Sequence, residues 1–349
     1  MGLPQIIIEF KTAGGSAVRR SARGQVVLLI PGEESGSAEY TSLPGEKPAG
    51  LSALGWRAVR LAMLGGPGKV VVRRYVPGTE EETLEDCAPA AEGGWLCAPW
   101  MDGDAVAALV RKKRAAGSPL RAVVEAGDGH DCAGVVDLAT QGIWVRLDEG
   151  AESVPTAQYC ARVAGILAGL SLKESATYHP LPEVTDITLS GDPEGDIQRG
   201  RLILDRGAQG VRLGRAVTSL VTLESPGDAA FQKIKITEGM DLIRADIRSV
   251  FESEYVGKVL NDYDSKLLLV TAINSYFAGL EGSVLDTGRK NRAAVDYKAQ
   301  KSWLESRGVD TGSMSETAIL SANTGSQVFL TAQVWFADAM EDLCFTITM

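Results

Sequence analysis

Apolar and polar residues alternate one by one near both ends of the chain. In "QIIIEFK", Ile6, Ile8 and Phe10 fall on one face, and in "LCFTITM" the same is true of Leu343, Phe345 and Ile347. A period of two is typical of a half-buried β-strand. A strand at a chain end needs a partner for its backbone N–H and C=O groups. The pattern therefore raises the question of whether these strands pair within the chain or with another molecule.

Between the two ends, the pattern predicts a layered α/β region. The aliphatic run "QVVLLIP", bounded by Gly24 and Pro31, suits a strand buried on both faces. Helical segments such as "LGWRAVRLAMLGG" and "DAVAALVRKKRAAG" alternate with further strand-like runs up to about residue 130, and "TAQYCARVAGILAGL" follows as an apolar helix. This alternation predicts a partly parallel sheet with helices packed on it.

The last third of the chain has a different pattern. The stretch "GVRLGRAVTSLVTL" predicts one or two strands. An apolar stripe through Met240, Ile243, Ile247, Phe251 and Tyr255 predicts a helix from Gly239 to Lys258, with Arg244, Asp246, Arg248 and Glu252 on its polar face. A second helix is predicted in "DYDSKLLLVTAINSYFAGLEG", with Leu267, Val270, Ile273, Phe277 and Leu280 on its apolar face. Two alternating strands flank "ADAMED" near the end; they form either a hairpin or two strands that separate.

These changes of pattern divide the chain into four predicted segments. They are an N-terminal extended arm and linker (1–21), an α/β domain (22–205), a C-terminal α+β domain (206–340) and a C-terminal arm strand (341–349). The predicted fold class is therefore α/β and α+β, with an extended strand arm at each end.

Composition excludes several functional classes. A net charge of −10 argues against nucleic-acid binding, because phosphate contacts need a basic field. No apolar run approaches the roughly 20 residues of a membrane span, and no basic region precedes an apolar one at the start. We therefore expect synthesis in the cytosol without membrane insertion. The five cysteines are scattered without CxxC spacing, which predicts reduced, buried thiols.

Motifs for catalysis or ligand binding are weak. "GGPGK" (65–69) lacks the phosphate-loop spacing and leads into a strand, so it predicts a turn. His130 and Cys132 are neighbours in a polar loop, and sequence neighbours are seldom catalytic partners. His179 precedes a proline in another loop, and "DPEGD" (192–196) lacks the calcium-loop register. We predict a protein that is not an enzyme and that needs no cofactor or metal.

Several long stretches closely resemble phage tail sheath proteins. The resemblance is nearest to the compact sheaths of myophage-like elements and diffocin-type contractile bacteriocins. It is densest from Gly214 onward and less clear over residues 80–155. It rests on "GLPQIIIEFKTAGGSAVRRSARG", "QYCARVAGILAGL" with "SATY" shortly after, "GRAVTSL", "KIKITEGMDLIRADIRSVFESEYVGKVLNDYDSKLLLVTAINSYFAGLEG" and "ANTGSQVFLTAQVWFADAMEDLCFTI".

This resemblance implies a subunit that polymerises as a helical sleeve around a tail tube and contracts to drive the tube through a cell envelope. Its implied partners are further copies of itself, the tube protein, and baseplate and tail-terminator proteins. Synthesis would take place in the cytoplasm of a bacterial host, followed by assembly into a virion tail or phage-tail-like particle. Residues 22–205 would form the sheath domain, and 206–340 would lie next to the tube.

The resemblance also assigns residues to roles. The residues matching the two family arms, which cross to neighbouring subunits and complete a small β-sheet there, are Ile6, Ile8, Phe10, Leu343, Phe345 and Ile347. We expect Gly14, Gly15 and Ser16 to act as a hinge, and Arg244 and Arg248 to contact the tube. The family's α/β part is often likened to the subtilisin fold, but likeness of fold does not imply hydrolysis.

Two alternatives remain open at this point. A closed ring or shell would also use strand exchange, and it would form particles of one size instead of tubes of variable length. A doubly wound enzyme is suggested only by the β-α-β pattern of residues 25–130. It would need titratable residues clustered at the carboxyl ends of strands.

Overall fold

The computed structural model describes residues 24–148 and 150–348. The predictions on Ile6, Ile8, Phe10, Gly14, Gly15 and Ser16 lie outside the described residues. The described chain falls into two compact units. We call residues 24–242 with 338–348 the α/β unit, and residues 243–337 the C-terminal unit.

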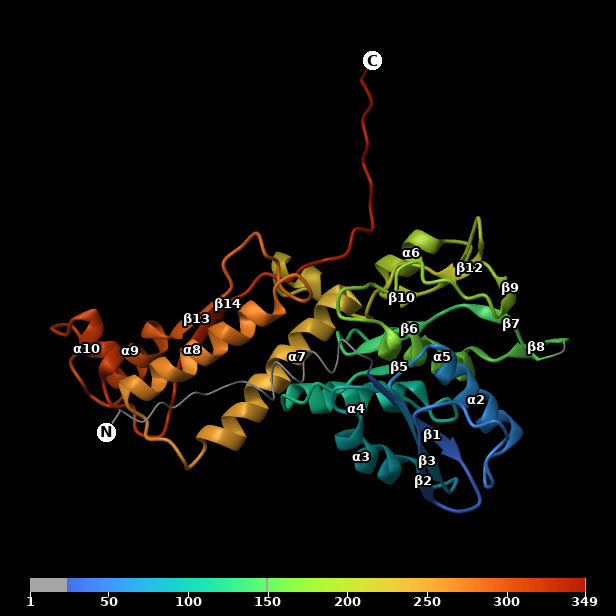
Figure 1. The fold of residues 1–349 in the computed structure, drawn as a ribbon, viewed down its shortest axis with the longest axis horizontal. Coiled ribbons are helices and arrows are strands. Elements are labelled where there is room, and N and C mark those ends of the chain that lie inside the picture. The colour runs from blue at the N-terminus through green and yellow to red at the C-terminus, as the bar shows by residue number, and fades with distance from the viewer. Residues whose placement is uncertain (1–23, 149, 349) are drawn as a thin grey trace. The chain divides into compact units, whose positions relative to one another are not determined.

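A seven-stranded sheet forms the centre of the α/β unit (Figure 1). The central strand β1 (Gln25–Pro31) runs parallel to both of its neighbours, β3 (Lys69–Tyr75) and β4 (Trp95–Cys97). On the β4 side the sheet continues with β5 (Ala122–Glu125), β6 (Val135–Leu138) and β10 (Arg201–Leu202), all parallel. On the other side, β2 (Gly36–Tyr40) closes the edge in antiparallel pairing. The predicted, partly parallel sheet is confirmed.

Helices cover both faces of this sheet. Val26, Leu28 and Ile30 of β1 pack in one core with helices α2 (Ala53–Leu64) and α5 (Thr156–Gly169). Val27 and Leu29 point to the opposite core, which holds helices α3 (Glu80–Ala91) and α4 (Gly103–Ala115). A strand covered on both faces is apolar throughout, which explains the unbroken aliphatic run in the sequence.

Glycines allow α2 and α5 to cross at very short range. A Cβ atom on Gly165 would lie 2.0 Å from the carbonyl oxygen of Ala62, and one on Gly169 would lie 1.9 Å from that of Gly65. Backbones that approach this closely leave no space for a side chain. The glycines of α5 therefore fix the α2–α5 contact and, through it, one whole face of the sheet.

Smaller elements complete the α/β unit. A three-stranded antiparallel sheet places β7 (Gln141–Asp148) between β8 (Gly150–Val154) and β9 (Val184–Thr188), and β11 (Leu204–Gly207) pairs with β12 (Gly210–Leu213). Helix α6 (Pro193–Gln198) lies in "DPEGD", with Asp192 capping its first turn. After β12, the predicted second strand is reduced to one isolated bridge, from Val217 to Lys233, followed by a 3-10 helix at Pro226–Gln232.

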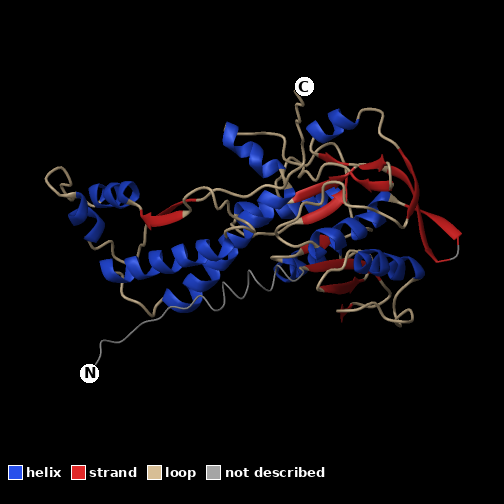
Figure 2. Ribbon diagram, turned by 45° about the horizontal axis from the view of Figure 1, so that its top comes forward, coloured by secondary structure: helices blue, strands red, loops and turns tan. Residues whose placement is uncertain are grey.

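The C-terminal unit is mainly helical. Helix α7 (Ile234–Val250) begins in the α/β unit, continues into the C-terminal unit and passes into a π-helical turn at Phe251–Tyr255. Helix α8 (Tyr263–Leu280) follows, and β13 (Arg292–Val295) pairs antiparallel with β14 (Leu330–Gln333). The pair is the short strand ribbon of this unit in Figure 2. Helices α9 (Tyr297–Ser306) and α10 (Glu316–Ser321) lie between the two strands in the sequence.

Two details of the predicted helices are wrong. Asp246, expected on the polar face of α7, is buried and accepts a hydrogen bond of 2.8 Å from the hydroxyl of Tyr276. Leu267 of α8, expected in the apolar stripe, is 41% exposed, whereas its neighbour Lys266 is buried. In both cases polar partners far along the chain decide which way a side chain faces. Of the helices that the structure describes, none is both long and apolar enough to cross a membrane.

Candidate functional site: the C-terminal arm and its root

Residues 343–348, here called the C-terminal arm, are exposed and have no regular secondary structure. Leu343 is 91% exposed, and Phe345 and Ile347 are each 75% exposed. Within the described chain, the arm makes no backbone–backbone hydrogen bond, and β14 pairs with β13 instead of forming a hairpin with it. Of the two arrangements expected for the last two strands, the second applies: they separate. The arm thus presents both an apolar face and unpaired backbone groups.

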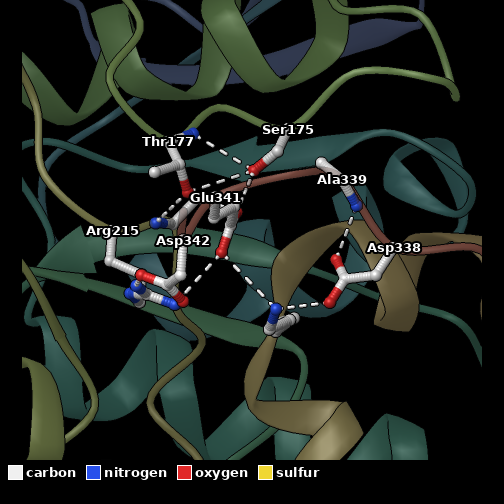
Figure 3. Close-up of polar contacts among 9 residues, drawn as sticks. Ser175, Thr177, Arg215, Asp338, Ala339, Glu341 and Asp342 are labelled. Carbon is white, nitrogen blue, oxygen red and sulfur yellow. Dashed lines mark hydrogen bonds and ion pairs between the residues drawn. The ribbon is translucent and has the colours of Figure 1, made fainter. Parts of the chain in front are cut away.

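The residues just before the arm are held firmly to the α/β unit by the carboxylate of Glu341, whose side chain is only 6% exposed (Figure 3). Its Oε1 accepts hydrogen bonds from the hydroxyls of Ser175, at 2.8 Å, and Thr177, at 2.7 Å. Its Oε2 is 3.3 Å from Nη1 of Arg215 and 3.4 Å from Nζ of Lys233. Two hydroxyls and two cations thus surround one carboxylate.

These donors come from three separate segments of the α/β unit. Ser175 and Thr177 lie in the loop between α5 and β9, Arg215 follows β12, and Lys233 directly precedes α7. The backbone N–H of Ala216 donates to the hydroxyl oxygen of Thr177 at 3.0 Å, which ties two of these segments together. The site is therefore assembled by the fold and is not visible as a short sequence motif.

The loop that supplies the hydroxyls contains a strained residue. Tyr178 has a φ of +60°, a region that non-glycine residues seldom occupy. Its N–H donates to the carbonyl of Leu213 at 3.1 Å, and the guanidinium of Arg212 lies 3.5 Å from the centre of its ring. Such strain persists only where surrounding contacts enforce it. The loop is thus held in one shape next to Glu341.

Two more carboxylates flank Glu341 with weaker contacts. Asp342 is 76% exposed and lies 2.5 Å from Nη2 of Arg215, and Asp338, 40% exposed, pairs with Lys233. The bond from Arg215 lowers the pKa of Asp342. Burial by itself lowers the pKa of Lys233, but its bond to Asp338 and the charge of Glu341 outweigh this, so the net pKa is raised. The bond to Asp342 also raises the pKa of Arg215, so Arg215 and Lys233 both keep their positive charges next to the three carboxyl groups.

In the C-terminal unit, the two edges of the β13–β14 pair differ. The side-chain amide of Asn274 in α8 bonds both backbone groups of Ala293, accepting from its N–H at 2.7 Å and donating to its C=O at 3.2 Å. Ala293 lies opposite Ala332, so this is a non-hydrogen-bonded pair and Ala332 directs its own backbone groups away from β13. Hydrogen-bonded and non-hydrogen-bonded pairs alternate along the two strands, so Leu330, two positions before Ala332, also directs its backbone groups away from β13. The outer edge of β13 is therefore capped, and within the described residues that of β14 is open.

The other candidate residues are placed as follows. Arg244 and Arg248 are exposed on α7, and neither forms an ion pair with any residue that the structure describes. His130 is buried, and its two ring nitrogens lie 2.5 Å from Asp137 and 2.9 Å from Asp104. Burial raises the pKa of Cys132. An imidazole engaged on both sides and a buried neutral thiol do not make a nucleophile–base pair.

Sequence comparison finds similarity to phage tail sheath proteins. Residues 227–349 match the family model of the phage tail sheath C-terminal domain. Over its full length the chain is 29% identical to a tail sheath protein of Clostridium phage phiCD119, covering 99% of that protein.

Solved structures share the fold. A sheath tail protein from Listeria innocua aligns with a TM-score of 0.65 at 14% identity, over 94% of this chain and 99% of that one. The helical sheath of the anti-feeding prophage in its contracted state aligns with a TM-score of 0.68 at 14% identity, over 94% of this chain and 93% of that one. The fold is therefore that of tail sheath proteins, and the match of residues 227–349 to the sheath C-terminal domain agrees with it.

The predicted resemblance to phage tail sheath proteins is confirmed. The relatives are structural tail sheath proteins, which agrees with the predicted structural role and excludes the enzyme alternative. The residues at the root of the arm, Ser175, Thr177, Arg215, Lys233 and Glu341, were not predicted as a site. The only signal in the sequence was the family-like "SATY", which contains two of them.

Proposed function

We propose that this protein polymerises as a helical sheath around a tail tube, and that each subunit donates its C-terminal arm to a neighbouring copy. The observation that carries the proposal is the arm itself: alternating apolar side chains, 75–91% exposed, on backbone that pairs with nothing in the described chain. In a monomer a segment of this kind promotes aggregation, and in an assembly it forms a contact between subunits.

The receiving element in the proposal is the open edge of β14. Strand addition satisfies the backbone groups of both chains, and alternate side chains set the register. Each hydrogen bond contributes about 1 kcal/mol net, and each buried apolar side chain roughly 1.5–3 kcal/mol. Three apolar side chains and a few backbone bonds are therefore enough to link two subunits.

The geometry of the link favours a sheath over a closed shell. Donor and acceptor are different surfaces, so the contact is heterologous, and a heterologous contact that does not close produces a helix. A contracting sheath needs joints that persist while the bodies of the subunits move. In the proposal the arms are these joints, with Gly14, Gly15 and Ser16 as the hinge of the N-terminal arm, and contacts between the bodies supply the energy of contraction.

The proposal extends to domains and partners. Residues 22–205 serve as the sheath domain and 206–340 as the tube-proximal domain. The tube protein is the template, with Arg244 and Arg248 as its contacts, and baseplate and tail-terminator proteins bind at the two ends. Exposed arginines without ion-pair partners in the described chain suit an acidic tube surface. Synthesis takes place in the cytoplasm of the bacterial host, before assembly into a tail or tail-like particle.

Negative-stain electron microscopy of the purified chain, alone and with its tube protein, tests the function. Helical tubes of variable length are expected. Rings or cages of a single size would establish the shell alternative, and monomers in both samples would refute self-assembly. A chain lacking Leu343–Met349 should remain folded and form no tubes; tubes of normal length from this deletion would rule out exchange of the arm.

A further inference from the structure

The three carboxylates just before the arm differ sharply in burial. The side chains of Asp338 and Asp342 are 40% and 76% exposed, whereas that of Glu341 is 6% exposed. Glu341 is also the last strongly held residue, because Leu343, two positions later, is 91% exposed. The transition from fixed chain to free arm therefore takes place within two residues.

The bonds of Glu341 make it the strongest of these attachments. Its two oxygens accept from two hydroxyls and two cations. A buried carboxylate in such a setting is difficult to release, since its departure leaves two cations and two hydroxyls without their shared acceptor. Exposed ion pairs such as that of Asp342 contribute far less.

We propose that Glu341 is a positioning residue that locks the root of the arm to the α/β unit. The chain reaches this point from the C-terminal unit, through β14 and Ala337, yet every partner of Glu341 belongs to the α/β unit. The arm therefore moves with the α/β unit of its own subunit. This inference rests on the proposed exchange of the arm. It specifies that force transmitted through the arm acts on the α/β unit of the subunit that donates it.

The lock also sets the reach of the arm. Ile347 lies six positions after Glu341, which corresponds to about 20 Å of extended chain. Apart from the partly exposed ion pair of Asp338 with Lys233, the nearest earlier attachment is Ala337, whose N–H donates to the carbonyl of Val284 at 2.9 Å. With the lock open, ten residues give a reach of about 33 Å. Effective concentration falls roughly as the −3/2 power of tether length, so lengthening the tether from six to ten residues lowers the effective concentration of the arm at the acceptor about twofold.

The chain contains a natural reporter for this test. Cys344 is exposed in the arm, whereas Cys87, Cys97, Cys132 and Cys160 are buried. A nitroxide on Cys344 thus reports the motion of the arm by electron paramagnetic resonance in the full-length, unassembled subunit. We expect Glu341→Gln to make the label clearly more mobile. The matched control, Asp342→Asn, changes an exposed neighbour that contacts the same Arg215 and should leave the spectrum unchanged.

A second variant keeps the test decisive if Glu341→Gln does not fold. Thr177→Val keeps the shape of the side chain and Glu341 itself, and it removes one donor to Oε1. Its label should be intermediate in mobility. The Tm should fall slightly, because the N–H of Ala216 also loses its acceptor. Wild-type mobility in both Glu341→Gln and Thr177→Val, with both variants folded, would overturn the lock.

Assembly separates this inference from the proposed function. If the lock holds, Glu341→Gln raises the concentration needed for tube formation about twofold, and Asp342→Asn does not change it. Normal tubes from the deletion of Leu343–Met349 would overturn the exchange of the arm even where the label shows a lock. Loss of tubes in that deletion, together with unchanged label mobility in Glu341→Gln, would overturn the lock alone.

Discussion

Strand β1 and the C-terminal arm both consist of apolar residues that suit an extended chain, but they have opposite surroundings. Val26 to Ile30 of β1 are 0% exposed, with a strand on each side and helices above and below. Leu343, Phe345 and Ile347 are 75–91% exposed. The difference teaches that a hydrophobic pattern indicates which side chains gain stability from burial. It does not indicate whether the surface that buries them belongs to the same chain.

The largest expected effect separates assembly from folding. Phe345→Asp should abolish tube formation, because it places a charge on the face of the arm that strand exchange buries. The subunit should keep its Tm, since Phe345 is exposed in it. Electron microscopy and thermal unfolding measure the two outcomes. Thr346→Asp adds the same charge on the opposite face and should still form tubes; equal loss in both variants would contradict a one-faced contact.

A matched pair of truncations compares the two regions directly. Leu28→Ala should lower the free energy of unfolding by about 2–5 kcal/mol, because it opens a cavity in a packed core. Leu343→Ala should change it by less than about 0.5 kcal/mol, as for an exposed site. Urea denaturation of the unassembled subunit measures both. A comparable cost at Leu343 would mean that the arm is buried in its own subunit.

A substitution at the α2–α5 crossing tests how much the close approach of these two helices, which cover one face of β1, contributes to stability. Gly165→Ala should destabilise the subunit by about 1–3 kcal/mol, because the new methyl group would lie 2.0 Å from the carbonyl oxygen of Ala62 and the helices must separate. Denaturation gives the free energy. Gly191→Ala is the control, since a Cβ there meets nothing within 4 Å and should change stability little.

The smallest effect depends on pH. The bond from His130 to Asp137 raises the pKa of His130 despite its burial. A raised folded-state pKa contributes stability that is fully present below the unfolded value of about 6.5 and is lost as the pH rises through the folded value. Unfolding free energy should therefore decline with rising pH over this interval, and His130→Asn should flatten the profile. An identical slope in both proteins would refute the assignment.

Local pattern was sufficient to predict the α/β core. The run at β1, the helical spacing of α5 and the glycines after α2 each depend on neighbours within a few residues, and each feature is present. Lys266 could not be predicted in this way. Its ammonium lies 3.2 Å from both Gln300 and Thr324, so its burial depends on residues 34 and 58 positions away.

The contacts at the root of the arm could not be predicted from the sequence either, because they join residues far apart in the chain. Ser175 lies 166 positions from Glu341, and "MEDL" carries no signal that one carboxylate is buried and the next exposed. Cys344 was expected among the buried thiols and is exposed, because the arm that contains it packs on no other part of the described chain. The strand that the period-two pattern predicts in the arm stays a prediction, because the described chain supplies no partner for it.

The open edge of β14 has a further consequence when it is considered together with the arm. In the proposed assembly each copy carries both halves of the joint, so every added subunit offers a fresh acceptor and the process has no internal stopping point. Growth of this kind behaves as nucleated polymerisation, with a threshold concentration below which subunits stay dispersed. A cell can then accumulate dispersed subunits until a template appears. The template then sets the length of the assembled sheath.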